Sequence, residues 1–362
     1  MNNTAYKLTN DGYGIHTFEI KIIHLTRKEY KILKKRLFEK GAMYDNDLKS
    51  VIIAITEKNS GIRIKLHNNA IPFLEVIVTP WTLLNYNNDP LRILSSKEWN
   101  GDKIESKLRE KLLFYLGDGF GLERFQLTRI DCTATFMFDD PSMTIKYLDL
   151  IKRSMKIGRG NIIRCWNAVS EEDYHNQMKH SFQVDFYDTK FTAYDKLYEI
   201  LMRDKDYCTD SGLLRIELAY NNIKINEISK LTNITQIIDL IKFFCDNAET
   251  LIRRFIYYRF SYGDHYSYEA AKEIIDASDL RKNSKYQILE HLIRNYCYDD
   301  FDSYIRETKR RLKSDMKYRV MKENMRILNI NLIPISKWER TENHLPGMYR
   351  LFGITEEEFN DE

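Results

Sequence analysis

The stretch from residue 191 to residue 220 decides how this chain folds. It begins Phe191-Thr-Ala-Tyr-Asp-Lys-Leu-Tyr-Glu-Ile200 and, after a polar connection, ends Gly212-Leu-Leu-Arg-Ile-Glu-Leu-Ala-Tyr220. Both halves have the aromatic, β-branched and alternating composition of strands, and alternate residues of a strand lie on the same face. The first half therefore predicts that Tyr194, Lys196 and Tyr198 lie together on one face of a sheet.

Two further strand segments each carry an arginine and an acid two residues apart. Arg215 and Glu217 are predicted to share one face of the second half, with apolar residues on the other face. Residues 127–136 repeat this pattern with Arg129 and Asp131. The three strands are candidates for one shared polar face of a sheet.

The order of the predicted elements repeats along the chain. A strand, a helix and several short strands occupy residues 15–78, and the same order begins again with a long strand at 125–138 and a helix at 142–155. Strand-like segments then continue to residue 220. This order predicts an α+β fold, with two strand-helix-strand units that have antiparallel sheets and form one domain over residues 1–224.

The sequence pattern changes after residue 224. Apolar residues now recur at three- and four-residue spacing, which indicates amphipathic helices, and one helix is predicted over residues 301–328. We therefore predict an all-helical C-terminal domain at residues 225–362, for binding DNA or a partner. Basic residues between 306 and 326 are interleaved with acids, so a phosphate-binding helix and an ordinary solvated face stay equal alternatives.

Composition sets limits on the class of protein. The 362 residues are 43% hydrophobic, which is enough for a sizeable core and for two domains. The net charge is only +3, so any nucleic-acid surface has to be a local patch. The cysteines are widely spaced and form no Cys-x-x-Cys pair, which argues against a zinc site or a disulfide framework and fits a reducing cytosol. They are Cys132, Cys165, Cys208, Cys245 and Cys297.

No segment has the pattern of a targeting or membrane-spanning sequence. The N-terminal residues lack the apolar core of a signal peptide. No apolar run approaches the roughly 18 residues that a membrane span requires. We therefore expect a cytoplasmic protein that does not associate with a membrane.

Several common catalytic motifs are missing. The sequence has no phosphate-binding P-loop, no glycine-rich dinucleotide turn, no Gly-x-Ser-x-Gly and no His-Glu-x-x-His. His175 and His180 are five residues apart in a segment predicted to be a loop, which is weak evidence for a metal site. Chemistry, if present, is expected from the polar strands instead.

The Arg-x-acid strands allow two interpretations. A carboxylate inside a sheet is costly unless it is paired, hydrogen-bonded or bound to a cation. Asp131 and Glu217 could therefore belong to structural ion pairs with Arg129 and Arg215, which is the preferred interpretation when each strand is taken alone. In the functional interpretation, the two acids are oxygen ligands for Mg²⁺ or Mn²⁺ and the arginines face a phosphate.

The tyrosine-lysine strand favours the functional interpretation. A tyrosine can attack phosphorus directly, but it needs activation to do so. A metal ion on the attacked phosphate and a nearby ammonium such as Lys196 would stabilise the developing negative charge. The contrary consideration is that a chain with 24 tyrosines produces such a pairing by chance.

Three motifs in this order resemble a known family. They are Arg129-Ile-Asp131, Tyr194-Asp-Lys-x-x-Glu199 and Leu214-Arg-Ile-Glu-Leu218. Together they resemble the replication initiation factor family of rolling-circle plasmids, with related conjugative relaxases and filamentous-phage gene II-type replication proteins. The motifs cover residues 127–220. A Thr-x-Tyr-x-Gly-Ser segment common in the family has no match at residues 161–172.

The resemblance implies a DNA strand-nicking and joining enzyme with a nicking-endonuclease-like fold. A tyrosine would cut one strand at an origin, leave a free 3′ hydroxyl and later rejoin ends, with Mg²⁺ or Mn²⁺ as cofactor. It implies Asp131 and Glu217 as metal or active-site acids. It also implies that the positive side chains of Arg129, Arg215 and Lys196 face a phosphate of the DNA.

The resemblance also leaves a choice of nucleophile and of partners. Tyr194 is the first choice, Tyr198 shares its predicted face, and Tyr187 and Tyr220 stay open. The expected partner is origin DNA, as a single-stranded nick site with flanking duplex. A host helicase and a second copy of the chain are further candidate partners. The alternatives are a DNA-binding protein that keeps the fold without catalysis, and a structural protein in which the tyrosine-lysine strand is ordinary packing.

Overall fold

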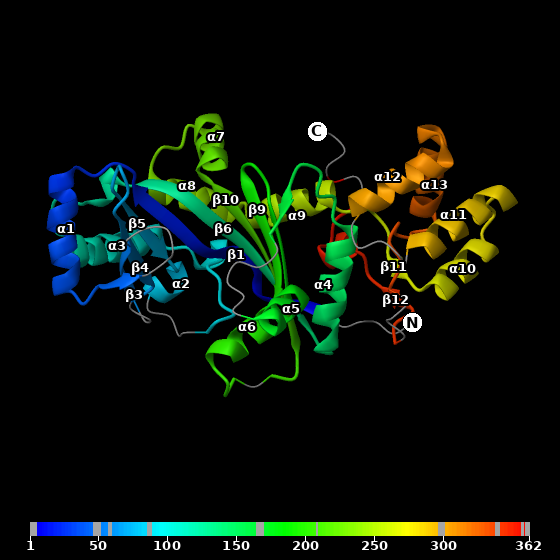
Figure 1. Cartoon of the computed structure of the whole chain (residues 1–362), viewed down its shortest axis with the longest axis horizontal. Coiled ribbons are helices and arrows are strands. Elements are labelled where there is room, and N and C mark those ends of the chain that lie inside the picture. The colour runs from blue at the N-terminus through cyan, green and yellow to red at the C-terminus, as the bar shows by residue number, and fades with distance from the viewer. Residues whose placement is uncertain are drawn as a thin grey trace.

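One antiparallel sheet runs through most of the molecule (Figure 1). The structure is a computed structural model of the chain, and it describes residues 6–45, 52–56, 60–84, 89–163, 170–207, 209–295, 301–336, 341–355 and 358. The sheet has ten strands in the order β2-β3-β4-β5-β1-β6-β10-β9-β8-β7. Helices cover it and extend beyond it, so the predicted α+β class is confirmed.

The sheet consists of two halves with the same order of elements. The first half comprises β1 (Tyr6–Ile22), α1 (Arg27–Glu39), β2 (Met43–Asp45), β3 (Ile52–Thr56), β4 (Ile62–His67) and β5 (Phe73–Val78). The second comprises β6 (Gln126–Phe138), α4 (Ser142–Ser154), β7 (Asn161–Ile162), β8 (Ser181–Asp185), β9 (Thr189–Asp195) and β10 (Gly212–Asn221). In each half the last strand pairs with the first, and β1 pairs with β6 at the centre. The repeated order predicted from the sequence is therefore present, joined into one sheet.

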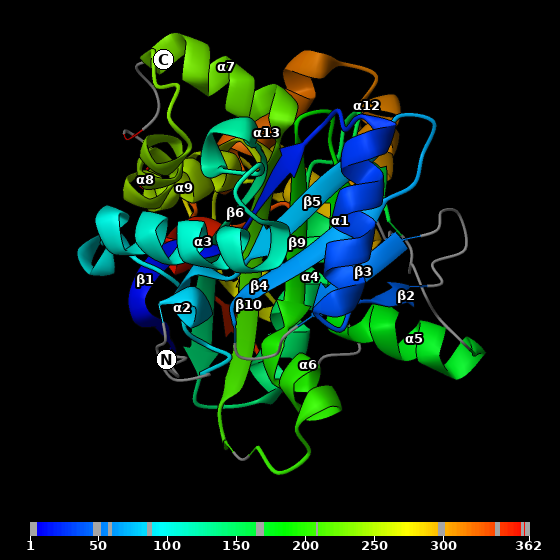
Figure 2. The same ribbon diagram turned by 90° about the vertical axis from the view of Figure 1, so that its left-hand side faces the viewer.

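Local signals explain where the first helix begins. The Thr26 side chain accepts a hydrogen bond from the Glu29 backbone N–H, and the Glu29 side chain accepts one from the Thr26 backbone N–H. This capping box satisfies two free N–H groups of the helix end. Helix α1 then lies across β3 and β4 beside α3 (Gly101–Leu116) (Figure 2).

Three predicted elements are wrong. The strand expected over residues 192–200 ends at Asp195, and α6 (Lys196–Arg203) follows it. The loop expected around His175 and His180 is α5 (Glu171–His180). The single helix expected over residues 301–328 is two helices, α12 (Phe301–Leu312) and α13 (Asp315–Ile327), because Lys313 between them has a positive φ of 51°.

One face of the sheet is apolar and covered by helices. Helices α7 (Asn222–Thr232), α8 (Ile237–Asp246) and α9 (Ala248–Arg259) share one hydrophobic core with the sheet, as do α1, α3 and α4. Phe191 of β9 stacks on Phe255 of α9 with ring centroids 5.4 Å apart, and Tyr220 of β10 contacts Phe244 of α8. The hydrophobic packing of the sheet thus continues past residue 224.

A second hydrophobic core lies in the C-terminal part. It unites α10 (Tyr268–Ala277), α11 (Lys282–Asn295), α12 and α13 with residues 330–333. A two-stranded ladder of β11 (His265–Tyr266) and β12 (His344–Leu345) connects it to the sheet region, and α14 (Met348–Leu351) returns to the first core. The domain division predicted after residue 224 stays a prediction.

The buried Asp264 joins these two parts of the chain. Its carboxylate accepts hydrogen bonds from Asn329, from His344 and from the backbone N–H of Gly347. The Arg350 guanidinium lies 2.8 Å from the same carboxylate. An acid that is 2% exposed is thus fully satisfied by groups from distant segments, as burial of a charge requires.

The remaining described helices are short, and none among the described segments is both long and apolar enough to cross a membrane. They are α2 (Pro80–Leu83) and two 3₁₀ turns at Ser96–Glu98 and Leu122–Arg124.

Cys132 and Cys245 are buried free thiols. Cys165, Cys208 and Cys297 lie outside the described residues, so the predicted lack of disulfides stays a prediction.

Candidate active site

The register of three central strands brings the predicted acids and tyrosine to one face. Residues that lie directly opposite each other in an antiparallel pair point to the same side. Asp131 of β6 lies opposite Ala219 of β10, two residues from Glu217. On the other side of β10, Tyr194 lies opposite Arg215. Asp131, Glu217 and Tyr194 therefore occupy the polar face, opposite the helix-covered one.

Tyr194 and Glu217 are in direct contact. The Tyr194 hydroxyl donates a hydrogen bond of 2.9 Å to Oε1 of Glu217. Burial, and then the negative charge of Glu217, raise the pKa of the Tyr194 hydroxyl well above its ordinary value. Tyr194 is therefore a protonated phenol at neutral pH, with a carboxylate in position to receive its proton.

His16 completes this group and was not among the residues singled out from the sequence. Its Nδ1 lies 3.5 Å from Oε1 of Glu217. Burial lowers the pKa of His16 well below its ordinary value, and the positive charges of Arg215 and Lys196 add to this. His16 reaches the polar face where β1 shifts register between Ile15 and Thr17. No local sequence signal identifies that bulge.

Asp131 is held by the arginine of its own motif. Nε of Arg129 donates to Oδ1 and Nη2 donates to Oδ2, both at 2.8 Å. The Asp131 side chain is 3% exposed, whereas that of Arg129 is 45% exposed. Burial raises the pKa of Asp131 while the Arg129 guanidinium opposes the shift. Both oxygens of Asp131 are engaged by a cation of the protein itself.

The expected tyrosine-lysine strand is replaced by a helix cap. Oδ1 of Asp195 accepts a hydrogen bond from the backbone N–H of Tyr198, so Asp195 caps α6 and the chain leaves the strand before Lys196. Lys196 pairs with Glu199 at 2.5 Å, and its ammonium lies 5.8 Å from the centre of the Tyr194 ring. Burial lowers the pKa of Lys196 to about 8. Lys196 is thus near Tyr194, but it extends from the first turn of α6 and not from the strand.

Tyr198 does not share the position of Tyr194. Its ring stacks on His180 with centroids 3.9 Å apart, and His180 Nδ1 lies 2.9 Å from Oδ2 of Asp195. His175 lies away from this group, 3.9 Å from Glu171 on an exposed helix face. The two histidines therefore do not form a ligand pair with each other.

The other two tyrosines are placed differently. Tyr220 is 5% exposed on the apolar face, where burial raises its pKa. Tyr187 is 83% exposed and follows the end of β8. Neither has the carboxylate contact that Tyr194 makes with Glu217.

Arg215 is fully buried. Its Nε donates to the Thr135 hydroxyl at 2.8 Å, and its Nη2 donates to the carbonyls of Pro90 and Leu91. These bonds fasten the connection between the two halves of the chain to the sheet. The position expected to face a phosphate is thus occupied by a side chain that no solvent reaches, although its Nη1 has no hydrogen-bond partner among the described residues.

The polar face continues into the first half of the sheet, where Glu19 and Glu75 are paired with lysines. Lys21 lies 2.9 Å from Glu19 and 3.1 Å from Glu75, and Lys65 lies 3.6 Å from Glu75. Although burial opposes it, the neighbouring imidazole of His67, 3.6 Å away, and the charge of Lys21 lower the pKa of Glu75 to about 2. Glu75 lies on the last strand of the first half, as Glu217 does in the second, but two lysines lie directly opposite Glu75 in the neighbouring strands.

The donor set can be tested for a metal. Asp131 and Glu217 offer carboxylate oxygens and His16 an imidazole nitrogen, which are suitable ligand types. Within the described ranges, however, no group of three His, Cys, Asp or Glu side chains is placed to hold a metal ion. A metal on both acids therefore requires Arg129 to release Asp131.

Comparison with known proteins gives a distant likeness to solved structures and no match by sequence. No protein-family model matches the sequence, and no curated protein matches it. Among solved structures, the chain is similar to the rolling circle replication initiator protein from Geobacillus stearothermophilus, with 10% identity and a TM-score of 0.33. The match covers 72% of this chain and 87% of that chain. It is too distant to assign a family or an activity.

Proposed function

We propose that this protein nicks and rejoins one strand of DNA to initiate rolling-circle replication, with Tyr194 as the nucleophile. The hydrogen bond from Tyr194 to Glu217 carries the proposal, because it pairs a nucleophile with a proton acceptor at 2.9 Å. The order of the three motifs, which resembles replication initiators, supports the choice of DNA. Lys196 supplies positive charge beside the phenol.

In the proposed reaction, Glu217 takes the phenol proton as Oη of Tyr194 attacks phosphorus. A bond forms between Oη and phosphorus, and the bond between phosphorus and the 3′ oxygen breaks. The 3′ oxygen takes up a proton from solvent water and leaves as a hydroxyl, while the 5′ phosphate stays on Tyr194. The reverse reaction, with a 3′ hydroxyl as the attacking group, rejoins the strand and restores the tyrosine.

Mg²⁺ or Mn²⁺ is part of the proposal. Asp131 and Glu217 would hold it, and it would supply positive charge at the attacked phosphate. Arg129 occupies both oxygens of Asp131, so we expect weak metal binding to the chain alone. Calorimetric titration with MnCl₂ tests this without measuring activity: Asp131→Asn should remove the binding, and equal binding by the variant would exclude Asp131 as a ligand.

A covalent adduct is the direct test of the nucleophile. The chain is incubated with supercoiled DNA that contains its own gene and flanking sequence, with Mg²⁺ or Mn²⁺, and the products are separated under denaturing conditions. We expect a protein-DNA adduct that Tyr194→Phe abolishes. Tyr198→Phe tests the second tyrosine, and Tyr286→Phe is the matched control because that tyrosine is 68% exposed in the C-terminal part. An adduct that persists in Tyr194→Phe would exclude Tyr194.

The second candidate function is DNA binding without catalysis. The observation that favours it is the closed pair of Asp131 and Arg129, which leaves neither Asp131 oxygen free. In that case the wild-type chain retards origin DNA on a gel and forms no adduct with either metal. Adduct formation by the wild-type chain excludes this alternative.

A further inference from the structure

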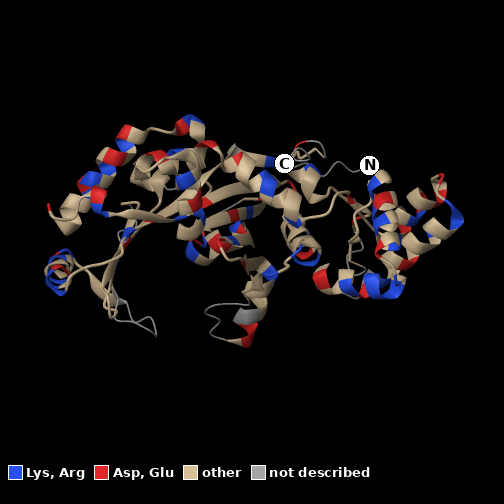
Figure 3. Cartoon of the chain, turned by 90° about the horizontal axis from the view of Figure 1, so that it is seen from above, with Lys and Arg blue, Asp and Glu red and all other residues tan. Residues whose placement is uncertain are grey.

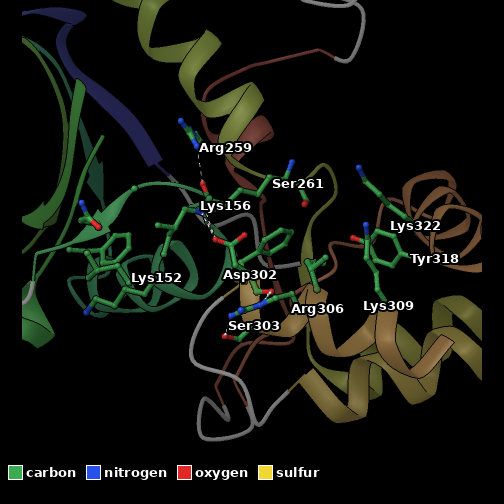
Figure 4. A pocket seen from close by; sticks show the side chains of 18 of the residues that line it. Lys152, Lys156, Arg259, Ser261, Asp302, Ser303, Arg306, Lys309, Tyr318 and Lys322 are labelled. Carbon is green, nitrogen blue, oxygen red and sulfur yellow. Dashed lines mark hydrogen bonds between the residues drawn. The ribbon is translucent and has the colours of Figure 1, made fainter. Parts of the chain in front are cut away.

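A basic cleft lies between the edge of the sheet and the C-terminal helices (Figure 4). Its volume is about 1270 Å³. One wall comes from the end of α4 and from β7 and β8, and the other from α12 and α13. Basic and acidic segments alternate along these C-terminal helices (Figure 3), yet the cations gather in the cleft. Among the described residues that line it, the cations are Lys152, Lys156, Arg259, Arg306, Lys309 and Lys322.

The one acid that lines the described part of this cleft is already in use. Oδ2 of Asp302, at the start of α12, accepts hydrogen bonds from the backbone N–H groups of Ile157 and Gly158, at 3.0 and 2.8 Å. These contacts tie α12 to the segment that follows α4. Asp302 therefore holds the two walls together, and its carboxylate faces backbone groups.

Five of the six cations make no ion pair with a described residue. Lys152 donates to the carbonyl of Met178 and Lys156 to that of Phe260, which satisfies hydrogen bonds but neutralises no charge. Arg306 donates to the Asp302 carbonyl and to a serine hydroxyl. Only Lys309 makes an ion pair, with Asp315 at 3.2 Å. The cleft thus concentrates positive charge in a chain whose net charge is only +3.

The charges in the cleft repel one another. Burial, together with the neighbouring charges of Lys322 and Arg259, lowers the pKa of Lys156 to about 8 against the attraction of Asp302. An anion with several negative groups would relieve this repulsion and meet several cations at once. Nucleic-acid backbones have this property, since each neutralised phosphate also releases counterions.

We infer that this cleft binds the backbone of single-stranded DNA. A duplex presents its phosphates on a stiff convex surface, so it would reach the exposed Arg306 and Lys322 but not the half-buried Lys152 and Lys156. A flexible single strand can enter a recess and contact all of them. The half-buried ring of Tyr318 lines the same cleft and offers a face on which a base can stack.

The cleft and the nicking site lie on the two faces of one strand. Phe182 of β8 lines the cleft, whereas Ser181, the preceding residue, lies opposite Tyr194. Successive residues of a strand point to opposite faces. A DNA strand that leaves Tyr194 therefore has to pass around the edge of the sheet to reach the cleft. That the cleft binds a polyanion is inferred from the cations that line it. That this polyanion is DNA rests on the proposed function.

Fluorescence anisotropy with a labelled oligothymidine tests the inference in EDTA, where no metal-dependent nicking occurs. A probe of about 20 nucleotides is longer than the roughly 4–16 nucleotides that one single-strand-binding fold covers. The variant Arg306→Gln/Lys322→Gln removes two exposed cations of the cleft. We expect its affinity to fall at least about tenfold, and the slope of log affinity against log salt to decrease by about 1.4, near 0.7 per lost phosphate contact.

The matched control is Lys317→Gln/Arg319→Gln, which removes the same charge from exposed positions of α13 outside the cleft. It should leave affinity and salt slope unchanged. Equal losses in the two variants, or tighter binding of a duplex or an oligouridine of the same length, would overturn the assignment. If the wild-type chain binds oligothymidine in the cleft but forms no Tyr194 adduct, the inference stands and the proposed function fails.

Discussion

The Tyr194 hydroxyl donates a hydrogen bond to Glu217 across neighbouring strands, although the two residues are not directly opposite in the ladder. Tyr194 pairs with Arg215, and Glu217 pairs with Thr192, so the contact is diagonal. Long side chains reach such diagonal neighbours on one sheet face. The contact makes the acid and the tyrosine one chemical unit.

Glu217→Gln should separate the roles of this acid. The amide keeps the size of the side chain but accepts no proton, so adduct formation should fall by about 10²–10⁴-fold. Since the charge of Glu217 raises the pKa of Tyr194, the variant should lower that pKa. NMR titration of ¹³C-labelled tyrosines reports the pKa directly. An unchanged Tyr194 titration would show that the two side chains do not interact in solution.

Asp195→Ala should destabilise the protein by about 1 kcal/mol, because α6 loses its N-cap hydrogen bond to Asp195. It also leaves His180 without its partner. Urea unfolding followed by circular dichroism measures the change. Asp195→Asn keeps a capping oxygen and should recover most of the stability; an equal loss in both variants would mean that the charge matters more than the cap.

Arg215→Met tests whether this arginine is structural. The variant leaves the carbonyls of Pro90 and Leu91 without a buried donor, so it should cost about 1–3 kcal/mol of unfolding free energy. Its adduct formation below the unfolding transition should stay within about tenfold of wild type. A stable variant that forms no adduct would instead place Arg215 in the chemistry.

We expect the buried His265 to make the stability of the folded protein depend on pH. Burial lowers its pKa to about 4, so the folded state keeps it neutral while the unfolded state binds a proton below about 6.5. The unfolded state then binds more protons, and stability is lost as pH falls from about 6.5 to about 4, by on the order of 3 kcal/mol.

Urea midpoints measured across that pH range test this dependence. The pH dependence should be shallower in His265→Gln, which also loses the bond from the ring to the Ile333 carbonyl. His24→Gln, at an exposed position, should keep the wild-type slope. The same slope in all three proteins would remove His265 as the source.

Several features were predictable because their causes are local. The capping box at Thr26 and Glu29 lies within four residues, and strand alternation put Asp131 on the same face of its strand as Arg129. The repeated order of elements also predicted the α+β class, since each half forms the same antiparallel arrangement. Short-range patterns of this kind need no knowledge of the rest of the chain.

Other features depend on contacts between distant segments. From the sequence, Asp195 could continue a strand or cap a helix. In the structure it caps α6 through the Tyr198 backbone N–H, and its other carboxylate oxygen contacts His180. Arg215 is buried because the carbonyls of Pro90 and Leu91, more than 120 residues away in sequence, accept its hydrogen bonds. Propensity alone does not distinguish such alternatives, because tertiary partners supply the deciding energy.

The sequence by itself therefore determined the class of fold, the polar strands, and a tyrosine and two acids as candidates for one polar face. Only the tertiary structure decided that His16 joins them, that Lys196 approaches from a helix, and that Arg129 holds Asp131. It also gathered cations from four segments into one cleft. The physical reason is that charge and burial depend on which side chains meet in space, whereas periodicity depends only on neighbours along the chain.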